Sequence, residues 1–256
     1  MKTALSALLL LPAAALASSD FDGTWKTRLD SMKVSGTPDT FQISGGTYLC
    51  SSCTPIIQVP ADGAPHPVSG HPYYDSVAVQ VVNPSSVEII DRKLGREVYD
   101  MTYVVSADGA TLTAKLSDRT GAQLAMLTFT ARRVAAAPAG AHAVSGSWQP
   151  DQLSAANDAV RTITYRMTPD DFSMQWNGQS YSAKFDGNQY PVAGDPAHTT
   201  VTVRKIDEHT VEETDRREGQ VTDEIRMAAA PDGRTMVITD RDMQHGQTTT
   251  MTLEKQ

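Results

Sequence analysis

Residues 62–111, DGAPHPVSGHPYYDSVAVQVVNPSSVEIIDRKLGREVYDMTYVVSADGAT, return 124 positions later as residues 186–235, DGNQYPVAGDPAHTTVTVRKIDEHTVEETDRREGQVTDEIRMAAAPDGRT. The two copies align without a gap and share 16 of 50 positions. The shared positions include the turn Asp108-Gly109, which returns as Asp232-Gly233. An internal duplication of this size predicts two successive units of the same fold.

The duplication divides the 256 residues into two domains. The first is predicted to span residues 18–134 and the second residues 144–256. Residues 135–143 join them and begin with the side-chain-poor run Ala135-Ala136-Ala137-Pro138, a composition typical of an exposed linker. A unit of about 110 residues is large enough to bury a core of its own.

Residues 1–17 have the pattern of a secretory signal peptide. Lys2 supplies a positive start, residues 4–15 form a short apolar run, and Ala15-Leu16-Ala17 matches the small-x-small cleavage pattern. We expect Sec-type export with cleavage after Ala17, and therefore a periplasmic or secreted protein in an oxidising compartment. We expect no membrane span, because no later segment is apolar enough to cross a bilayer.

The charge of the chain argues against polyanionic partners. The formal net charge is −8, and basic residues cluster no further than pairs such as Arg132-Arg133 and Arg216-Arg217. Nucleic acids and anionic membrane surfaces require a concentrated positive field. We therefore expect no nucleic-acid partner.

Each unit reads as one β-strand after another. Residues 77–81 and 87–90 are β-branched runs separated by the turn cluster Asn83-Pro84-Ser85-Ser86. Asp108-Gly109 is a strong hairpin-turn signal. About eight strands are expected in each unit and no long helix, so the predicted fold class is all-β, with two antiparallel β-barrels or sandwiches in tandem.

The start of each unit carries a Gly-x-Trp motif, Gly23-Thr24-Trp25 and Gly146-Ser147-Trp148. Together with meandering hairpins and a basic residue at the end of the last strand, this motif resembles lipocalin-like (calycin) barrels. The resemblance implies that each Trp closes the barrel floor beneath a stacked base. The base would be Arg132 or Arg133 in the first unit and Lys255 in the second. The alternative role for both Trp residues is core anchoring alone.

A second resemblance concerns two short pieces of the first unit. Cys-Ser-Ser-Cys at residues 50–53 and Gly-His-Pro-Tyr at residues 70–73 are similar to pieces of bacterial secreted tandem-repeat proteins. This resemblance implies an organisation but no chemistry.

Cys50 and Cys53, the chain's two cysteines, have no counterparts in the second unit, where Met174 and Asn177 align with them. An oxidising compartment favours a structural disulfide between them. A redox centre uses the same spacing but usually places the first Cys at a helix N-terminus, and no helix is expected here. A metal site with His66 or His71 is the third alternative.

His66, His71 and Tyr73 are also specific to the first unit, since Tyr190, Asp195 and Ala197 align with them. A feature that one copy lacks is not needed merely to form the fold. Each His precedes a Pro and therefore lies in extended backbone. They are candidates for metal or ligand binding, with exposed loop histidines as the alternative.

No enzyme signature is present. The chain has no Gly-x-Ser-x-Gly elbow, phosphate loop or dinucleotide-binding fingerprint. The acidic run that contains Glu212, Glu213, Asp215 and Glu218 is interpreted as a solvated hairpin of mixed charge. We therefore predict a non-enzymatic protein without a cofactor that binds a small apolar ligand or an envelope partner. The alternative is a redox-active or metal-binding protein that uses the Cys pair.

Overall fold

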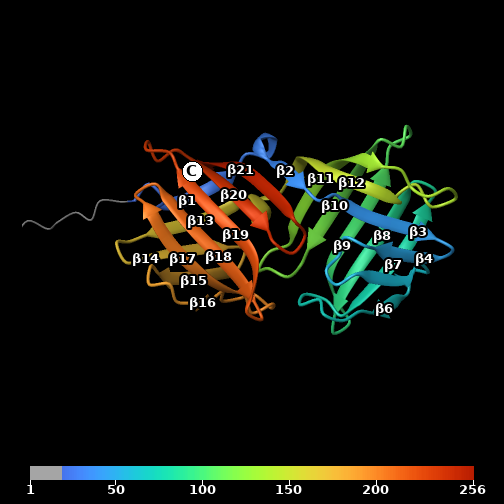
Figure 1. Ribbon diagram of the computed structural model, residues 1–256, viewed down its shortest axis with the longest axis horizontal. Coiled ribbons are helices and arrows are strands. Elements are labelled where there is room, and N and C mark those ends of the chain that lie inside the picture. Colours follow the sequence, from blue (N-terminus) through green and yellow to red (C-terminus); the bar gives the residue numbers. More distant parts are fainter. Residues whose placement is uncertain (1–18) are drawn as a thin grey trace, which may run out of the picture.

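The computed structural model describes residues 19–256, so the predicted signal peptide lies outside the described residues. Strands form nearly all of its regular structure. The helical elements of the described residues are the short η1 (Leu29–Ser31) and α1 (Asp158–Arg161), and neither is long enough to cross a membrane. Two nearly closed antiparallel barrels lie side by side (Figure 1), which confirms the predicted fold class.

The first barrel is a sheet of ten strands in the order β5-β4-β3-β12-β11-β10-β9-β8-β7-β6. The strands are β3 (Asp39–Ser44), β4 (Thr47–Cys50), β5 (Ile57–Pro60), β6 (Pro65–Pro67), β7 (Ser76–Asn83), β8 (Ser86–Lys93), β9 (Arg96–Val105), β10 (Thr111–Asp118), β11 (Ala125–Ala135) and β12 (Gly146–Ala156). All ten come from one continuous segment of the chain.

The second barrel has the corresponding order β15-β14-β13-β1-β21-β20-β19-β18-β17-β16. Its strands are β1 (Gly23–Thr27), β13 (Thr162–Met167), β14 (Asp171–Trp176), β15 (Gln179–Lys184), β16 (Tyr190–Pro191), β17 (Thr200–Asp207), β18 (Thr210–Arg217), β19 (Gln220–Ala229), β20 (Thr235–Asp242) and β21 (Gln247–Lys255). A further strand, β2 (Lys33–Gly36), pairs with β21. The prediction of about eight strands per barrel missed short ones such as β6 and β16.

The Gly-x-Trp strands do not lie in the barrels that the sequence repeat assigns to them. β1 pairs with β13 and β21 of the second sheet, and β12 pairs with β3 and β11 of the first. In Figure 1 the blue β1 accordingly lies among the orange and red strands. The registers correspond, since Gly23 is opposite Tyr165 and Gly146 is opposite Phe41. The predicted unit boundaries therefore differ from the sheet boundaries at these strands.

This exchange also changes the stacking partners of the two Trp residues. The guanidinium of Arg133 lies 4.0 Å from the ring centroid of Trp148, and the ammonium of Lys255 lies 5.2 Å from that of Trp25. The expectation that Arg132 or Arg133 stacks on Trp25 is wrong, because Trp25 lies in the other barrel. Arg132 is exposed. Inward and outward side chains alternate along a strand, so only Arg133 of the two points inward.

The glycine of each motif makes room for the stacked base. Gly23 and Gly146 have φ angles of 130° and 128°, which L side chains rarely adopt. A Cβ on Gly23 would lie 2.9 Å from Cε of Lys255, and one on Gly146 would lie 2.5 Å from a guanidinium nitrogen of Arg133. The Gly-x-Trp motif therefore allows a basic side chain to pack closely against the glycine and over the Trp ring at the floor of each barrel.

Each barrel has its own core. Trp148 and Trp25 are fully buried members of separate clusters, and their indole N–H groups donate to the carbonyls of Val144 and Phe21, each at 2.8 Å. The buried members of the first cluster include Tyr48 and Tyr103. Burial of such large rings stabilises each barrel independently.

Candidate functional site

The Cys pair forms the predicted disulfide. Cys50 ends β4 and is bonded to Cys53, with a Cα–Cα distance of 5.4 Å. These are the two cysteines of the chain, so neither is free. The segment after Cys53 leads into strand β5 rather than a helix. The helix N-terminus that lowers a thiol pKa in many redox centres is therefore missing at this site.

The two histidines lie in different environments. The ring of His66 lies on β6, with Nε2 2.8 Å from a carboxylate oxygen of Asp62. His71 is 8% exposed and stacks on Tyr74 at 4.6 Å between ring centroids. Burial lowers the pKa of His71, which favours a neutral ring. Within residues 19–256 no three His, Cys, Asp or Glu side chains are grouped to hold a metal ion.

A cleft of about 740 Å³ gathers several of the residues that distinguish the first copy. Cys53, His71 and Tyr73 line one side, and Arg217 and His245 of the second barrel line the other. The Tyr73 hydroxyl donates to a carboxylate oxygen of Asp195 at 3.1 Å, and the guanidinium of Arg217 lies 5.7 Å from the Tyr73 ring centroid. These residues therefore connect the two barrels.

The interior of the second barrel contains a pair of carboxyl groups, Glu213 and Asp215. Strand β18 alternates, so both point inward together with the fully buried Val211. Glu213 is 6% exposed and accepts a hydrogen bond from the hydroxyl of Tyr181, and Asp215 is the next inward-facing residue of the same strand. The interpretation of this run as a solvated hairpin is wrong for these two positions.

Burial raises the pKa of both carboxyl groups. For Glu213 burial is the main cause, and for Asp215 burial and the neighbouring Glu213 together raise the pKa to about 9. Two neighbouring buried carboxyl groups cannot both ionise easily, and Asp215 therefore keeps its proton at neutral pH. One carboxyl oxygen of Asp215, Oδ1, is buried without a hydrogen-bond partner.

Three more carboxyl groups continue this cluster on the neighbouring strands. Asp223 lies opposite Asp215, and Asp242 lies opposite Asp223. Asp240 also points inward, because it alternates with the buried Ile238; burial and then Asp223 raise its pKa to about 7. Its Oδ1 is also buried without a partner.

Two basic side chains from the cleft contact this carboxyl cluster. A guanidinium nitrogen of Arg217 lies 3.6 Å from Asp223, and Nδ1 of His245 lies 2.6 Å from a carboxylate oxygen of Asp242. The hydrogen bond that His245 donates to Asp242 raises the pKa of His245 and favours its charged form. The cleft therefore adjoins the acidic part of the barrel interior.

An apolar cavity of about 310 Å³ opens at the mouth of the second barrel. Its wall consists of side chains on the inner face of the sheet: Thr27, Ile163, Trp176, Ile238, Met251 and Leu253. Met32, Leu127, Leu153, Val160 and Arg161 cover it. Leu127 and Leu153 belong to the first barrel, so both barrels form this cavity.

A second cavity of about 230 Å³ borders the first. The two share Met32, Leu127 and Leu153. The second is also lined by Asp39 and by Thr249, the register partner of Asp240. Burial raises the pKa of Asp39. The mouth region thus runs from an apolar end toward the carboxyl groups.

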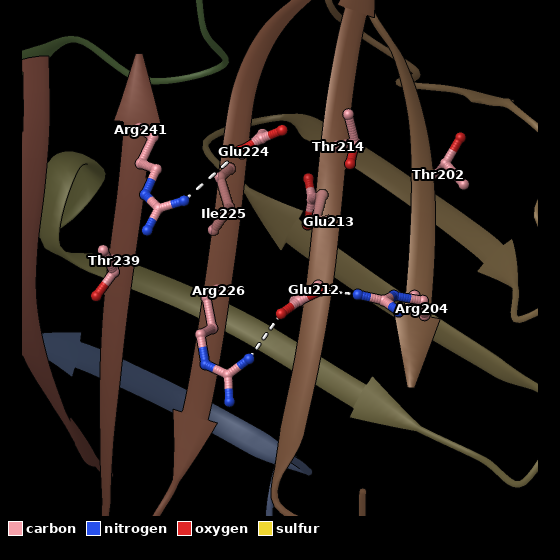
Figure 2. A pocket seen from close by; sticks show the side chains of 10 residues that line it. All are labelled: Thr202, Arg204, Glu212, Glu213, Thr214, Glu224, Ile225, Arg226, Thr239 and Arg241. Atoms are coloured by element: carbon pink, nitrogen blue, oxygen red, sulfur yellow. Dashed lines mark hydrogen bonds and ion pairs between the residues drawn. The ribbon is translucent and has the colours of Figure 1, made fainter. Parts of the chain in front are cut away.

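The outer face of the second barrel carries a groove of a different kind, about 620 Å³ in volume (Figure 2). Glu212 lies between Arg204 and Arg226, with closest approaches of 2.5 and 2.6 Å. Arg241 approaches Glu224 at 3.8 Å. Hydrogen bonding to Arg204 lowers the pKa of Glu212. Because its charges face one another, this groove is an exposed ion-pair ladder with little charge left to attract a ligand.

No family model, no curated protein and no solved structure matches this chain in the comparisons with known proteins.

Sequence reasoning identified the Cys pair and the Tyr73 region but missed the interior carboxyl groups. A signal was present, because Val211-x-Glu213-x-Asp215 alternates like Val87-x-Ile89-x-Asp91 of the first copy. Once Val87 is assigned to the core, Glu213 must share its face. The apolar cavity had no comparable signal, since its wall and cover come from segments far apart in the chain.

Proposed function

We propose that this protein binds a small, largely apolar molecule in the 310 Å³ cavity at the mouth of the second barrel. It acts without catalysis, as a periplasmic or secreted binding protein. The observation that carries the proposal is the cavity itself, a recess at the barrel mouth with an almost wholly apolar wall. Its volume lies at the lower end of the range for small-molecule sites.

The composition of the wall supports a ligand rather than a packing defect. Ile163, Trp176 and Met251 face the space from three strands, and residues of the other barrel cover it. The Trp176 indole N–H donates to the carbonyl of Val160 at 3.1 Å, which fixes the ring at the cavity edge. A ligand that buries these surfaces gains the free energy of removing apolar area from water.

The Cys pair supports a redox or metal function less well. Both sulfur atoms are engaged in one bond, no helix follows, and His66 pairs with Asp62 instead of approaching the sulfurs. The disulfide closes the loop that carries Cys53 to the cleft, which fits a structural role.

The proposal is tested with N-phenyl-1-naphthylamine, an apolar dye that is neutral at pH 7 and fluoresces when removed from water. For about 17 non-hydrogen atoms at about 0.4 kcal/mol each, we expect a Kd on the order of 10 μM. The substitution Met251→Trp fills the cavity and is expected to weaken binding at least tenfold, since the added ring takes the space of the dye.

Val237→Trp is the matched control, because Val237 is 42% exposed on the outer face of the neighbouring strand β20. This variant should bind like the unaltered protein. Far-UV circular dichroism establishes that both variants are folded. Dye binding that Met251→Trp leaves unchanged would place the ligand elsewhere and refute the proposal.

A further inference from the structure

We infer that the ligand is an amphipathic cation, an organic amine whose apolar body fills the cavity and whose ammonium group meets the interior carboxyl groups. This inference rests on the proposed function and adds the charge of the ligand to it.

The geometry places the carboxyl groups beside the apolar cavity. Ile238 lines the cavity, and Asp240 is the next inward-facing residue of the same strand. Successive inward positions are about 7 Å apart. Thr249, opposite Asp240, already lines the bordering cavity together with Asp39. An alkyl or aryl amine that lies along the mouth therefore reaches a carboxyl oxygen with its nitrogen.

The charges in this region are not balanced. Six carboxyl groups lie along this region, and the side chains facing them include two basic ones, Arg217 and His245, and the hydroxyl of Tyr181. The carboxyl groups are those of Asp39, Glu213, Asp215, Asp223, Asp240 and Asp242. Buried carboxylates are stable when they are paired with a cation or protonated. Asp215, with a pKa of about 9, is mostly protonated at neutral pH, whereas the carboxyl groups that ionise there, such as Asp240, lack a matching cation that a ligand ammonium supplies.

Unpartnered polar atoms give a second reason. Asp215 Oδ1 and Asp240 Oδ1 are buried without a hydrogen-bond partner, and Glu213 beside them is 94% buried. A buried acceptor without a donor is destabilising. A primary ammonium carries three N–H donors on one atom and can satisfy such acceptors. The carboxyl groups of residues 19–256 are not arranged as a metal-binding group, which favours an organic cation.

The test compares three ligands with the same eight-carbon chain: octylamine, octanol and octanoate. Each is titrated against the protein loaded with N-phenyl-1-naphthylamine, and dye displacement is measured at pH 7.5. Octylamine is expected to bind at least tenfold more tightly than octanol, and octanoate the most weakly, because the carboxyl groups repel it.

Asp240→Asn is expected to reduce the preference for octylamine over octanol by about tenfold while dye binding is retained. Glu224→Gln, on the outer face, removes the same charge outside the barrel and should leave the preference unchanged. Glu213→Gln gives the same comparison if Asp240→Asn does not fold. The ligand series on the unaltered protein needs no variant.

The preference should also rise between pH 6 and pH 8. The pKa of Asp240 is about 7, so its carboxyl group loses its proton across this range while octylamine stays protonated. Octanol displacement should not change. Equal affinities for octylamine and octanol overturn the inference but still support the proposed apolar binding site. If neither the dye nor any of the three eight-carbon ligands binds, the proposed function is overturned and the inference with it.

Discussion

The two barrels share a frame of strands but differ in what fills them. At aligned positions the first barrel has Ile89, Tyr99 and Leu116 where the second has Glu213, Asp223 and Asp240. Both keep one inward carboxyl group on the equivalent strand, Asp91 in the first barrel and Asp215 in the second. Burial raises the pKa of Asp91 to about 7. Asp242 likewise has a counterpart, Asp118, in the first barrel. The second barrel therefore has three additional inward carboxyl groups, those of Glu213, Asp223 and Asp240.

This difference indicates where each copy is specialised. Buried rings fill much of the first barrel, where Phe41 lies between Tyr48 and Tyr103 at 6.4 and 5.4 Å between ring centroids. Extra carboxyl groups in the second barrel destabilise it unless something else compensates their charge. Such a loss of stability at one site, beside a cavity, is typical of a functional region.

The barrels also differ in how the chain builds them, which leads to the largest expected effect. Residues 37–157 contain every strand of the first sheet. Residues 19–134, the described part of the predicted unit 18–134, lack β12 and Trp148. Fragment 37–157 should unfold cooperatively in urea, whereas fragment 19–134 should show no unfolding transition. Trp fluorescence measures both.

For the second barrel, residues 144–256 lack β1 and Trp25 and should be unfolded, while adding the separate peptide 19–36 should restore a cooperative transition. Cooperative folding of fragment 19–134 would contradict the strand exchange.

An effect of intermediate size is expected from the two basic side chains that stack on the Trp rings, Arg133 and Lys255. Arg133 donates to the carbonyls of Gly109, Ser145 and Ala143 at 2.6, 2.6 and 2.8 Å. Lys255 makes one longer contact, 3.4 Å to the carbonyl of Asp20. Arg133→Met is expected to lower the free energy of unfolding by about 3 kcal/mol, because three carbonyls lose their donor. Lys255→Met should lower it by about 0.5 kcal/mol.

Urea denaturation followed by Trp fluorescence measures both effects. Arg132→Met, at the exposed neighbouring position, is the matched control and should have almost no effect. Equal losses for Arg133→Met and Lys255→Met would show that the hydrogen bonds to the carbonyls contribute nothing beyond the stacking.

The smallest expected effect is on the pH dependence of the free energy of unfolding, which should differ between the interiors of the two barrels. In the unfolded chain an Asp has a pKa near 3.9, and in the folded second barrel that of Asp215 is about 9. The folded protein therefore holds a proton that the unfolded chain has lost, so stability falls as pH rises from about 4 to about 9. Asp215→Asn should remove most of this dependence and raise the free energy of unfolding at pH 8 by roughly 2 kcal/mol.

Asp91→Asn is the corresponding change in the first barrel. Because the pKa of Asp91 is about 7, its contribution should fall over a narrower range, between about pH 4 and pH 7. Denaturation at several pH values measures both. A stability of the unaltered protein that rises from pH 5 to pH 8 would show that these carboxyl groups are not buried as described.

Much of the fold was accessible from the sequence. The repeat of residues 62–111 and the alternating strands predicted two antiparallel barrels, and the oxidising compartment favoured the Cys50–Cys53 disulfide. The Gly-x-Trp resemblance found the residues of both barrel floors. It assigned the bases Arg133 and Lys255 to the wrong Trp, since a motif does not state which sheet its strand joins.

The candidate site was predicted only in part. Tyr73, His71 and Cys53 were selected because the second copy lacks them, and they line the cleft between the barrels. For Glu213 and Asp215 the sequence predicts a solvated hairpin instead, because charged residues are usually exposed. Their alternation with Val211 places them inside the barrel, and within one strand this alternation decides the side-chain direction whatever the charge.

By itself the sequence determined which segments are strands, where they turn and which residues anchor each core, because hydrophobic alternation, Asp-Gly turns and Trp residues act locally. Only the tertiary structure decided which barrel each Gly-x-Trp strand completes, and it alone formed the cavity roofed by Leu127 and Leu153. The physical reason is that the two copies present nearly equivalent pairing edges. The choice between them depends on contacts between residues more than a hundred positions apart, which no local pattern records.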